Sequence, residues 1–168
     1  MNLFKLAGLL ILGIYGILGA FKPEYFSLIN GVNLLFHEAG HQFLMPFGEY
    51  LHIWGGTLFQ LLFPFGIGIA FLIKREPASA SVMFWWSAQN LFPISAYIKD
   101  ARAQVLPYVG GEIHDWGYIL SYHHWLGYDQ WIGNSVWCVG ILGTLSAITF
   151  GIFASKMRVL EKPTSPLF

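Results

Sequence analysis

Charged residues are scarce in this chain: only 11% of its 168 residues are Asp, Glu, Lys or Arg, against about a quarter in a typical soluble domain. This deficit argues against a soluble surface. Five stretches are almost wholly apolar, and each has about the length of a membrane-crossing helix: 6–21, 26–48, 50–73, 77–98 and 130–155. We therefore predict an all-α integral membrane protein with about five transmembrane helices.

Cysteine is also nearly absent, since Cys138 is the only one. A single cysteine excludes an intrachain disulfide and a thiolate metal cluster. The net charge is zero, which gives no electrostatic reason to expect a nucleic acid as partner. The expected partners are instead the lipid bilayer and a membrane protein or peptide substrate, with the oligomeric state left open.

The positions of Lys and Arg predict an orientation, because short cytoplasmic loops are enriched in these residues. With five crossings, six of them fall on one side (Lys22, Lys74, Arg75, Lys156, Arg158 and Lys162) and three on the other (Lys5, Lys99 and Arg102). This bias places the N-terminus outside and the C-terminus in the cytoplasm. Residues 1–160 are expected to form one membrane-embedded domain, followed by a short disordered tail at 161–168 that is rich in proline.

The longest connection between apolar stretches runs from Lys99 to Gln130 and contains most of the polar residues. Gly110 and Gly111 indicate a turn. The following segment, Trp116 to Trp131, repeats Tyr and Trp, which is typical of a segment at the membrane interface. We expect an interfacial helix between the fourth and fifth crossings.

The second apolar stretch contains the run His37-Glu38-Ala39-Gly40-His41. Residues four apart on a helix are separated by about 40° around the axis and roughly 6 Å along it, so His37 and His41 can bind one metal ion. Glu38 is the only carboxylate within the five stretches, and an unpaired charge there costs about 2.5–3.5 kcal/mol. Two histidines and a glutamate in this spacing predict a Zn²⁺ site in which Glu38 takes a proton from water. Gly40 and Ala39 would let another helix approach closely.

The segment Phe36 to His41 resembles the zinc helix of the site-2 protease group of intramembrane metallopeptidases. The segment Asn90-Leu91-Phe92-Pro93-Ile94 is similar to the Asn-x-x-Pro stretch that precedes the metal-binding Asp of that group. The resemblance implies a zinc peptidase that cleaves a peptide bond in or near the membrane. The chain differs from the group at this point: Asp100 follows the proline after more residues than in the group, and it precedes Ala101 rather than Gly.

Two residues compete for the place of third metal ligand. Asp100 can reach the histidines only if its helix bends inward after Pro93. His114 can reach them only if the Gly110-Gly111 segment turns the chain back into the bundle, and Asp115 would then orient an imidazole from outside the ligand set. Both are retained as candidates, and Asp115 itself stays open as a third possibility.

Other polar residues allow further interpretations. His123 and His124, together with His37 and His41, weakly resemble the histidine boxes of di-iron membrane oxidases; at an interface they are more typical of headgroup-level residues. Gln60, Gln89 and Asn90 are expected to hydrogen-bond between helices, and Arg102 to pair with Asp100.

The sequence thus favours a membrane-embedded zinc hydrolase of the HExxH type, with Glu38 as catalytic base and His37, His41, His114 and Asp100 as metal ligands. Two alternatives stay open: a non-catalytic membrane subunit that binds a metal or haem, and a lipid hydrolase.

Overall fold

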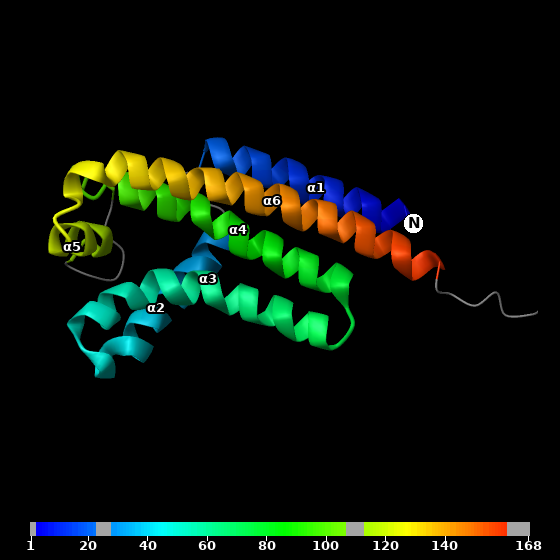
Figure 1. The fold of residues 1–168 in the computed structure, drawn as a ribbon, viewed down its shortest axis with the longest axis horizontal. Coiled ribbons are helices and arrows are strands. Elements are labelled where there is room, and N and C mark those ends of the chain that lie inside the picture. The colour runs from blue at the N-terminus through cyan, green and yellow to red at the C-terminus, as the bar shows by residue number, and fades with distance from the viewer. Residues whose placement is uncertain (1–2, 23–27, 107–112, 161–168) are drawn as a thin grey trace, which may run out of the picture.

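The computed structural model describes residues 3–22, 28–106 and 113–160, and these residues are almost entirely helical. Figure 1 shows the helices packed roughly side by side, with a short helix, α5, across one end. In chain order they are α1 (Leu3–Phe21), α2 (Leu28–Leu44), η1 (Met45–Phe47), α3 (Glu49–Ile73), α4 (Pro77–Lys99), α5 (Asp115–Tyr122), η2 (Leu126–Tyr128) and α6 (Asp129–Leu160).

Each of the five apolar stretches forms one long helix, which confirms the all-helical fold class. Turn residues separate them: Pro46 and Gly48, the latter with φ +100°, lie between α2 and α3, and Pro77 begins α4. Two segments are long and apolar enough to cross a membrane by length and composition: α3 and Leu126–Ser155, which includes most of α6. The predicted tail at 161–168 and the Gly110-Gly111 turn lie outside the described residues.

Helix α4 lies between α3 and α6 and buries its polar side chains against both. Asn90 Nδ2 donates to the Gln60 carbonyl oxygen of α3 at 2.9 Å, and Gln89 Nε2 donates to Thr144 Oγ1 of α6 at 2.9 Å. The predicted hydrogen bonding of Gln60, Gln89 and Asn90 between helices is therefore confirmed. Because these amides are satisfied inside the bundle, α4 can be less apolar than its neighbours.

Helices α2 and α3 approach each other at two glycines. A Cβ on Gly40 would collide with the carbonyl oxygen of Gly55, and a Cβ on Gly55 would collide with that of Gly40. The predicted role of Gly40 as a close-approach residue is confirmed. Ala39, in contrast, is exposed.

Each helix runs antiparallel to its neighbour in the order α1, α6, α4, α3, α2, because contacting residue numbers rise on one helix as they fall on the other. The contacts that show this are Gly13–Ile148 and Gly16–Thr144 for α1 and α6, and Gly151–Ser81 and Gly140–Phe92 for α6 and α4. For α4 and α3 they are Gly68–Phe84 and Gln60–Asn90, and for α3 and α2 they are Gln60–His37 and Gly55–Gly40. Four reversals of direction leave α1 and α2 pointing the same way (Figure 1).

This shared direction differs from the alternation that five full crossings require. The connection from Phe21 to Leu28 reaches at most about 25 Å when extended, which is less than the about 30 Å of a hydrocarbon core. Consequently α1 and α2 cannot both cross a bilayer completely. The apolar periodicity identified the helices, but it carries no information on their direction.

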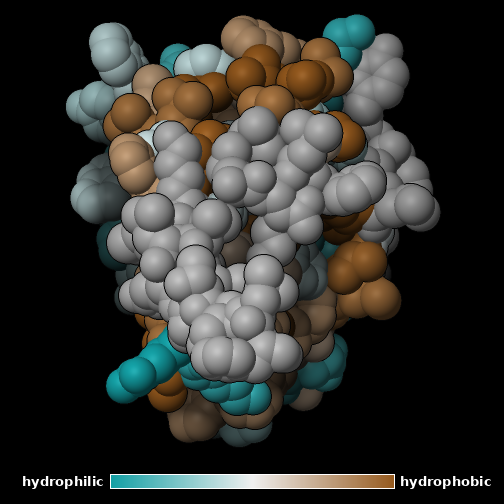
Figure 2. Space-filling model, turned by 90° about the vertical axis from the view of Figure 1, so that its right-hand side faces the viewer, coloured by the Kyte–Doolittle hydropathy of each residue, from teal (hydrophilic) through white to brown (hydrophobic). Residues whose placement is uncertain are grey.

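Large hydrophobic side chains remain exposed along the outer helices. Figure 2 views the bundle from the right-hand end of Figure 1 and shows such side chains gathered across the top and along the right-hand side. Among those that are more than 40% exposed are Leu10, Ile11, Ile14 and Leu18 of α1, Leu62, Phe63 and Phe65 of α3, and Val139, Leu142, Leu145 and Phe153 of α6. Soluble monomers rarely expose apolar surface on this scale.

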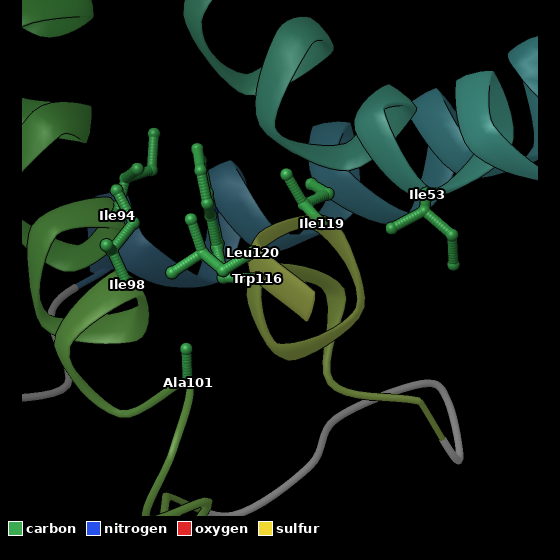
Figure 3. Packing of buried hydrophobic residues seen from close by; sticks show 7 residues of the cluster. All are labelled: Ile53, Ile94, Ile98, Ala101, Trp116, Ile119 and Leu120. Atoms are coloured by element: carbon green, nitrogen blue, oxygen red, sulfur yellow. The ribbon is translucent and has the colours of Figure 1, made fainter. Parts of the chain in front are cut away.

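Helix α5 is held in place by a hydrophobic cluster at the end of the bundle. Figure 3 shows Trp116, Ile119 and Leu120 of α5 together with residues of α3 and α4. The full cluster is Ile53, Ile94, Ile98, Ala101, Trp116, Ile119 and Leu120. A helix is thus present in the segment predicted to be interfacial, but it is short, and this packing fixes the start of α5 next to α2 and α3.

Candidate functional site

Three ligand-type side chains meet where α5 abuts α2. His37 Nε2 lies 2.9 Å from Asp115 Oδ2, and His41 Nε2 lies 3.3 Å from the same oxygen. One ligand atom from each of the three residues lies within 4.8 Å of the others. Ligands about 2.0–2.1 Å from a tetrahedral Zn²⁺ are separated from one another by about 3.3 Å. The spacing of the three residues therefore fits a metal of this size.

The ring of His41 is oriented by His52 in the first turn of α3. His41 Nδ1 donates to the His52 carbonyl oxygen at 2.7 Å, and His52 Nδ1 donates to the His41 carbonyl oxygen at 2.8 Å. A carbonyl oxygen can only accept, so Nδ1 of His41 must carry a hydrogen. In the neutral ring, Nε2 of His41 is therefore a lone pair directed towards Asp115.

The ring of His37 is oriented by a chain of amides that begins on α4. Asn90 Nδ2 donates to two backbone carbonyl oxygens, so Asn90 Oδ1 must accept from Gln60 Nε2, at 3.0 Å. Gln60 Oε1 then faces His37 Nδ1 at 3.3 Å and accepts its hydrogen. Nε2 of His37 is consequently also a lone pair in the neutral ring.

Two imidazole lone pairs and a carboxylate oxygen thus converge on one point, and three acceptors cannot hydrogen-bond one another. Burial on its own would raise the pKa of Asp115, but His37 and His41 outweigh it when their rings are protonated, through hydrogen bonds and positive charge, and hold this pKa below its ordinary value. Asp115 is accordingly ionised at neutral pH. A shared cation, either a metal ion or protons on the rings, is required to stabilise the arrangement.

Gly56 on α3 keeps the space beside the two rings open. A Cβ at this position would lie 2.5 Å from His37 Nε2 and 2.6 Å from His41 Nε2. Any side chain there would collide with both imidazole rings and displace their Nε2 atoms. A glycine is therefore needed if these nitrogens are to bind an ion.

Glu38 follows His37 on α2 and is half-buried. Its charge acts on His41, so the carboxylate belongs to the same electrostatic environment as the three ligand-type residues. It is not among the residues whose ligand atoms meet. This placement suits a base beside a metal site better than a ligand.

The two predicted third ligands lie next to each other and outside the His37, His41 and Asp115 group. Helix α4 continues through Pro93 to Lys99 without the inward bend that Asp100 needed. Asp100 instead accepts from the amides of Val105 and Leu106, at 3.0 Å each, and its Oδ2 lies 3.4 Å from His114 Nε2. Asp115, the residue after His114, lies beside the two histidines, where the sequence had predicted His114 or Asp100 as the third ligand.

Two other polar assignments are resolved by contacts. Arg102 pairs with Asp129, at 2.7 Å between Nε and Oδ2, rather than with Asp100 as predicted, because Asp129 begins α6 beside the end of α4. His123 Nε2 accepts from Tyr50 Oη at 2.7 Å, and His124 is exposed. Neither histidine belongs to the metal-type group of the described residues.

Sequence reasoning missed His52, Gln60 and Gly56 as parts of the site. Gln60 was expected only to link helices, and His52 was not assigned a role. One usable signal was present: the second pair of small residues, Gly55 and Gly56, follows the HExxH run after a turn. Such a pair marks the point at which the facing helix passes closest to the metal-type histidines.

No protein-family model matches the chain, and no curated protein and no solved structure matches it either.

Proposed function

We propose that the protein is a membrane-embedded zinc hydrolase whose metal ligands are His37, His41 and Asp115. The observation that supports this proposal is the convergence of two imidazole Nε2 lone pairs and one carboxylate oxygen, with both Nδ1 atoms already used as donors. Two histidines and one carboxylate are a set found at catalytic zinc sites, where the fourth position stays open for water or substrate.

The proposed reaction assigns one role to each part of the site. Bound Zn²⁺ would supply Lewis-acid chemistry that makes a water nucleophilic near neutral pH. Glu38 takes the proton of that water and passes it to the leaving group. The side chains of His37 and His41 are only 13% and 12% exposed, so the proton is moved in a site that largely excludes bulk water. The resemblance of the zinc helix to site-2 proteases favours a peptide bond as the one cleaved.

The helix directions support four membrane crossings, made by α1, α3, α4 and α6. Helix α2 does not cross; around it, the chain enters and leaves the membrane at the end of the bundle that holds the site. Lys5, Lys74, Arg75, Lys156 and Arg158 then lie at the far end, and Lys22, Lys99 and Arg102 at the site end. By the positive-inside tendency, both termini are cytoplasmic and the metal site opens on the outer side. This proposal replaces the outward N-terminus expected from five crossings.

The metal assignment predicts about one Zn²⁺ per purified chain. His37→Ala, His41→Ala and Asp115→Ala should each purify without it and bind added Zn²⁺ only with much lower affinity, because a three-ligand site that loses one ligand binds far more weakly. His124→Asn is the matched control, since His124 is exposed with φ +59°, a conformation that Asn tolerates. Elemental analysis of detergent-purified protein provides the measurement. Two irons per chain, or no metal after gentle purification of the unmodified protein, would exclude the proposal.

The role of Glu38 predicts that Glu38→Gln keeps zinc but hydrolyses at least about 100-fold more slowly, the scale of a lost general base. Mass spectrometry of proteoliposomes that contain membrane-spanning peptides would detect the products. Ester-linked phospholipid in the same vesicles tests the alternative substrate, because release of fatty acid without peptide cleavage would show a lipid hydrolase. If Glu38→Gln loses zinc as readily as His41→Ala, the base assignment is wrong.

The space at Gly56 predicts that Gly56→Ala prevents zinc binding, because the added methyl group would collide with the rings of His37 and His41 and move their Nε2 atoms apart from Asp115. Gly66→Ala, on the same helix with nothing within 4 Å of the added Cβ, is the control and should retain full zinc occupancy. Thermal unfolding of both variants in detergent would show whether the fold is kept. Full zinc occupancy in Gly56→Ala would place the ion elsewhere.

The four-crossing topology predicts the labelling pattern of single cysteines in a Cys138→Ser background. An impermeant maleimide added to intact cells should label Val105→Cys, which is 79% exposed in the native residue at the site end. It should not label Lys5→Cys or Arg75→Cys until the membrane is opened. Labelling of Lys5→Cys in intact cells would instead support an N-terminus on the outer side, as expected from five crossings.

A further inference from the structure

His114 is buried at the start of α5, immediately before Asp115. It is 3% exposed, and its Nδ1 accepts from the backbone amide of Gly117 at 3.0 Å, so that its side chain caps the helix that begins with Asp115. A ring nitrogen that accepts carries no hydrogen, which puts the hydrogen of the neutral ring on Nε2.

Nε2 of His114 faces the carboxylate of Asp100 without a hydrogen bond of good geometry. The distance from His114 Nε2 to Asp100 Oδ2 is 3.4 Å, and Asp100 is 7% exposed. Through its bonds to the amides of Val105 and Leu106, Asp100 also closes the turn that follows α4. The ring of His114 is thereby tied to the end of α4 on one side and to α5 on the other.

Tyr97 makes a second connection between α4 and α5. Its ring lies against that of His114, with 4.1 Å between centroids and 33° between planes. Its hydroxyl oxygen accepts from the backbone amide of Asp115 at 3.1 Å. Tyr97 therefore contacts both the capping residue and the backbone of the residue whose carboxylate meets the two histidines.

We infer that Tyr97, Asp100 and His114 form a positioning unit that fixes the carboxylate of Asp115 at the metal site, and that none of the three binds the metal. This inference rests on the proposed zinc site and adds to it the residues that set the geometry of its third ligand. A carboxylate on the first residue of a short helix needs such support, because an unheld helix end frays and would carry the ligand away from the ion.

The test is a double-mutant cycle between His114 and Asp115, made on the full chain in detergent with Zn²⁺ affinity measured by chelator competition. His114→Ala should weaken zinc binding about 10- to 100-fold, as expected for a partner that orients a ligand. His114→Asn should restore most of this loss, because the Asn side chain can also accept from the amide of Gly117. In an Asp115→Ala background, His114→Ala should change the affinity by less than about twofold, since both residues act on the same ligand.

Spectroscopy separates positioning from ligation. At saturating Co²⁺, His114→Ala should show the same d–d absorption bands as the unmodified protein, because the ligand set is unchanged once the site is filled. A different spectrum would make His114 a ligand and overturn the inference. So would a loss of Zn²⁺ affinity from His114→Ala that is as large in the Asp115→Ala background as in the native background. An unchanged affinity in His114→Ala would overturn it as well.

Tyr97→Phe keeps the inference testable if His114→Ala fails to fold. It removes only the hydroxyl that accepts from the Asp115 amide, and it should weaken zinc binding about tenfold with unchanged Co²⁺ bands. An unchanged zinc affinity in Tyr97→Phe would contradict the positioning unit. If the unmodified protein binds no zinc, the proposed function itself fails. If it binds zinc and the cycle is additive, only the positioning unit is excluded.

Discussion

The structure depends on the convergence of His37, His41 and Asp115, three acceptors that cannot satisfy one another. Each is held from a different direction. His41 is fixed by His52 in the first turn of α3, and His37 by Gln60 of α3, which is itself fixed by α4; Asp115 is placed by α5. These contacts hold three acceptors together, and a cation at their centre would relieve the repulsion between them.

The sequence predicted the parts of the site that follow from local spacing. His37 and His41 share a helix face because four residues are close to one turn, and Gly40 allows α3 to approach because it lacks a side chain. The five apolar stretches became helices for an equally local reason, since backbone groups in an apolar environment must bond within their own segment. Zinc and hydrolysis remain predictions.

The rest depends on contacts between distant segments, which spacing does not encode. The choice between His114 and Asp115 is decided by the start of α5: the first caps the helix and the second is carried to the histidines. Arg102 was assigned to the wrong carboxylate because Asp129 comes near only when α6 packs on α4. The direction of α2 could not be predicted either, because the apolar pattern of a helix is the same whichever way the helix runs.

The shared direction of α1 and α2 also bears on the insertion cost of Glu38. In a helix that crosses completely, this carboxylate would lie in hydrocarbon with a cost of about 2.5–3.5 kcal/mol. In the proposed topology α2 returns through Pro46 and Gly48 at the end where Asp115 begins α5. Glu38 and His41 then lie within two turns of the end of α2 at Leu44, close to the polar connection that follows α4. In that topology, the water that Glu38 deprotonates can enter from this end without passing the apolar surfaces of α1, α3 and α6.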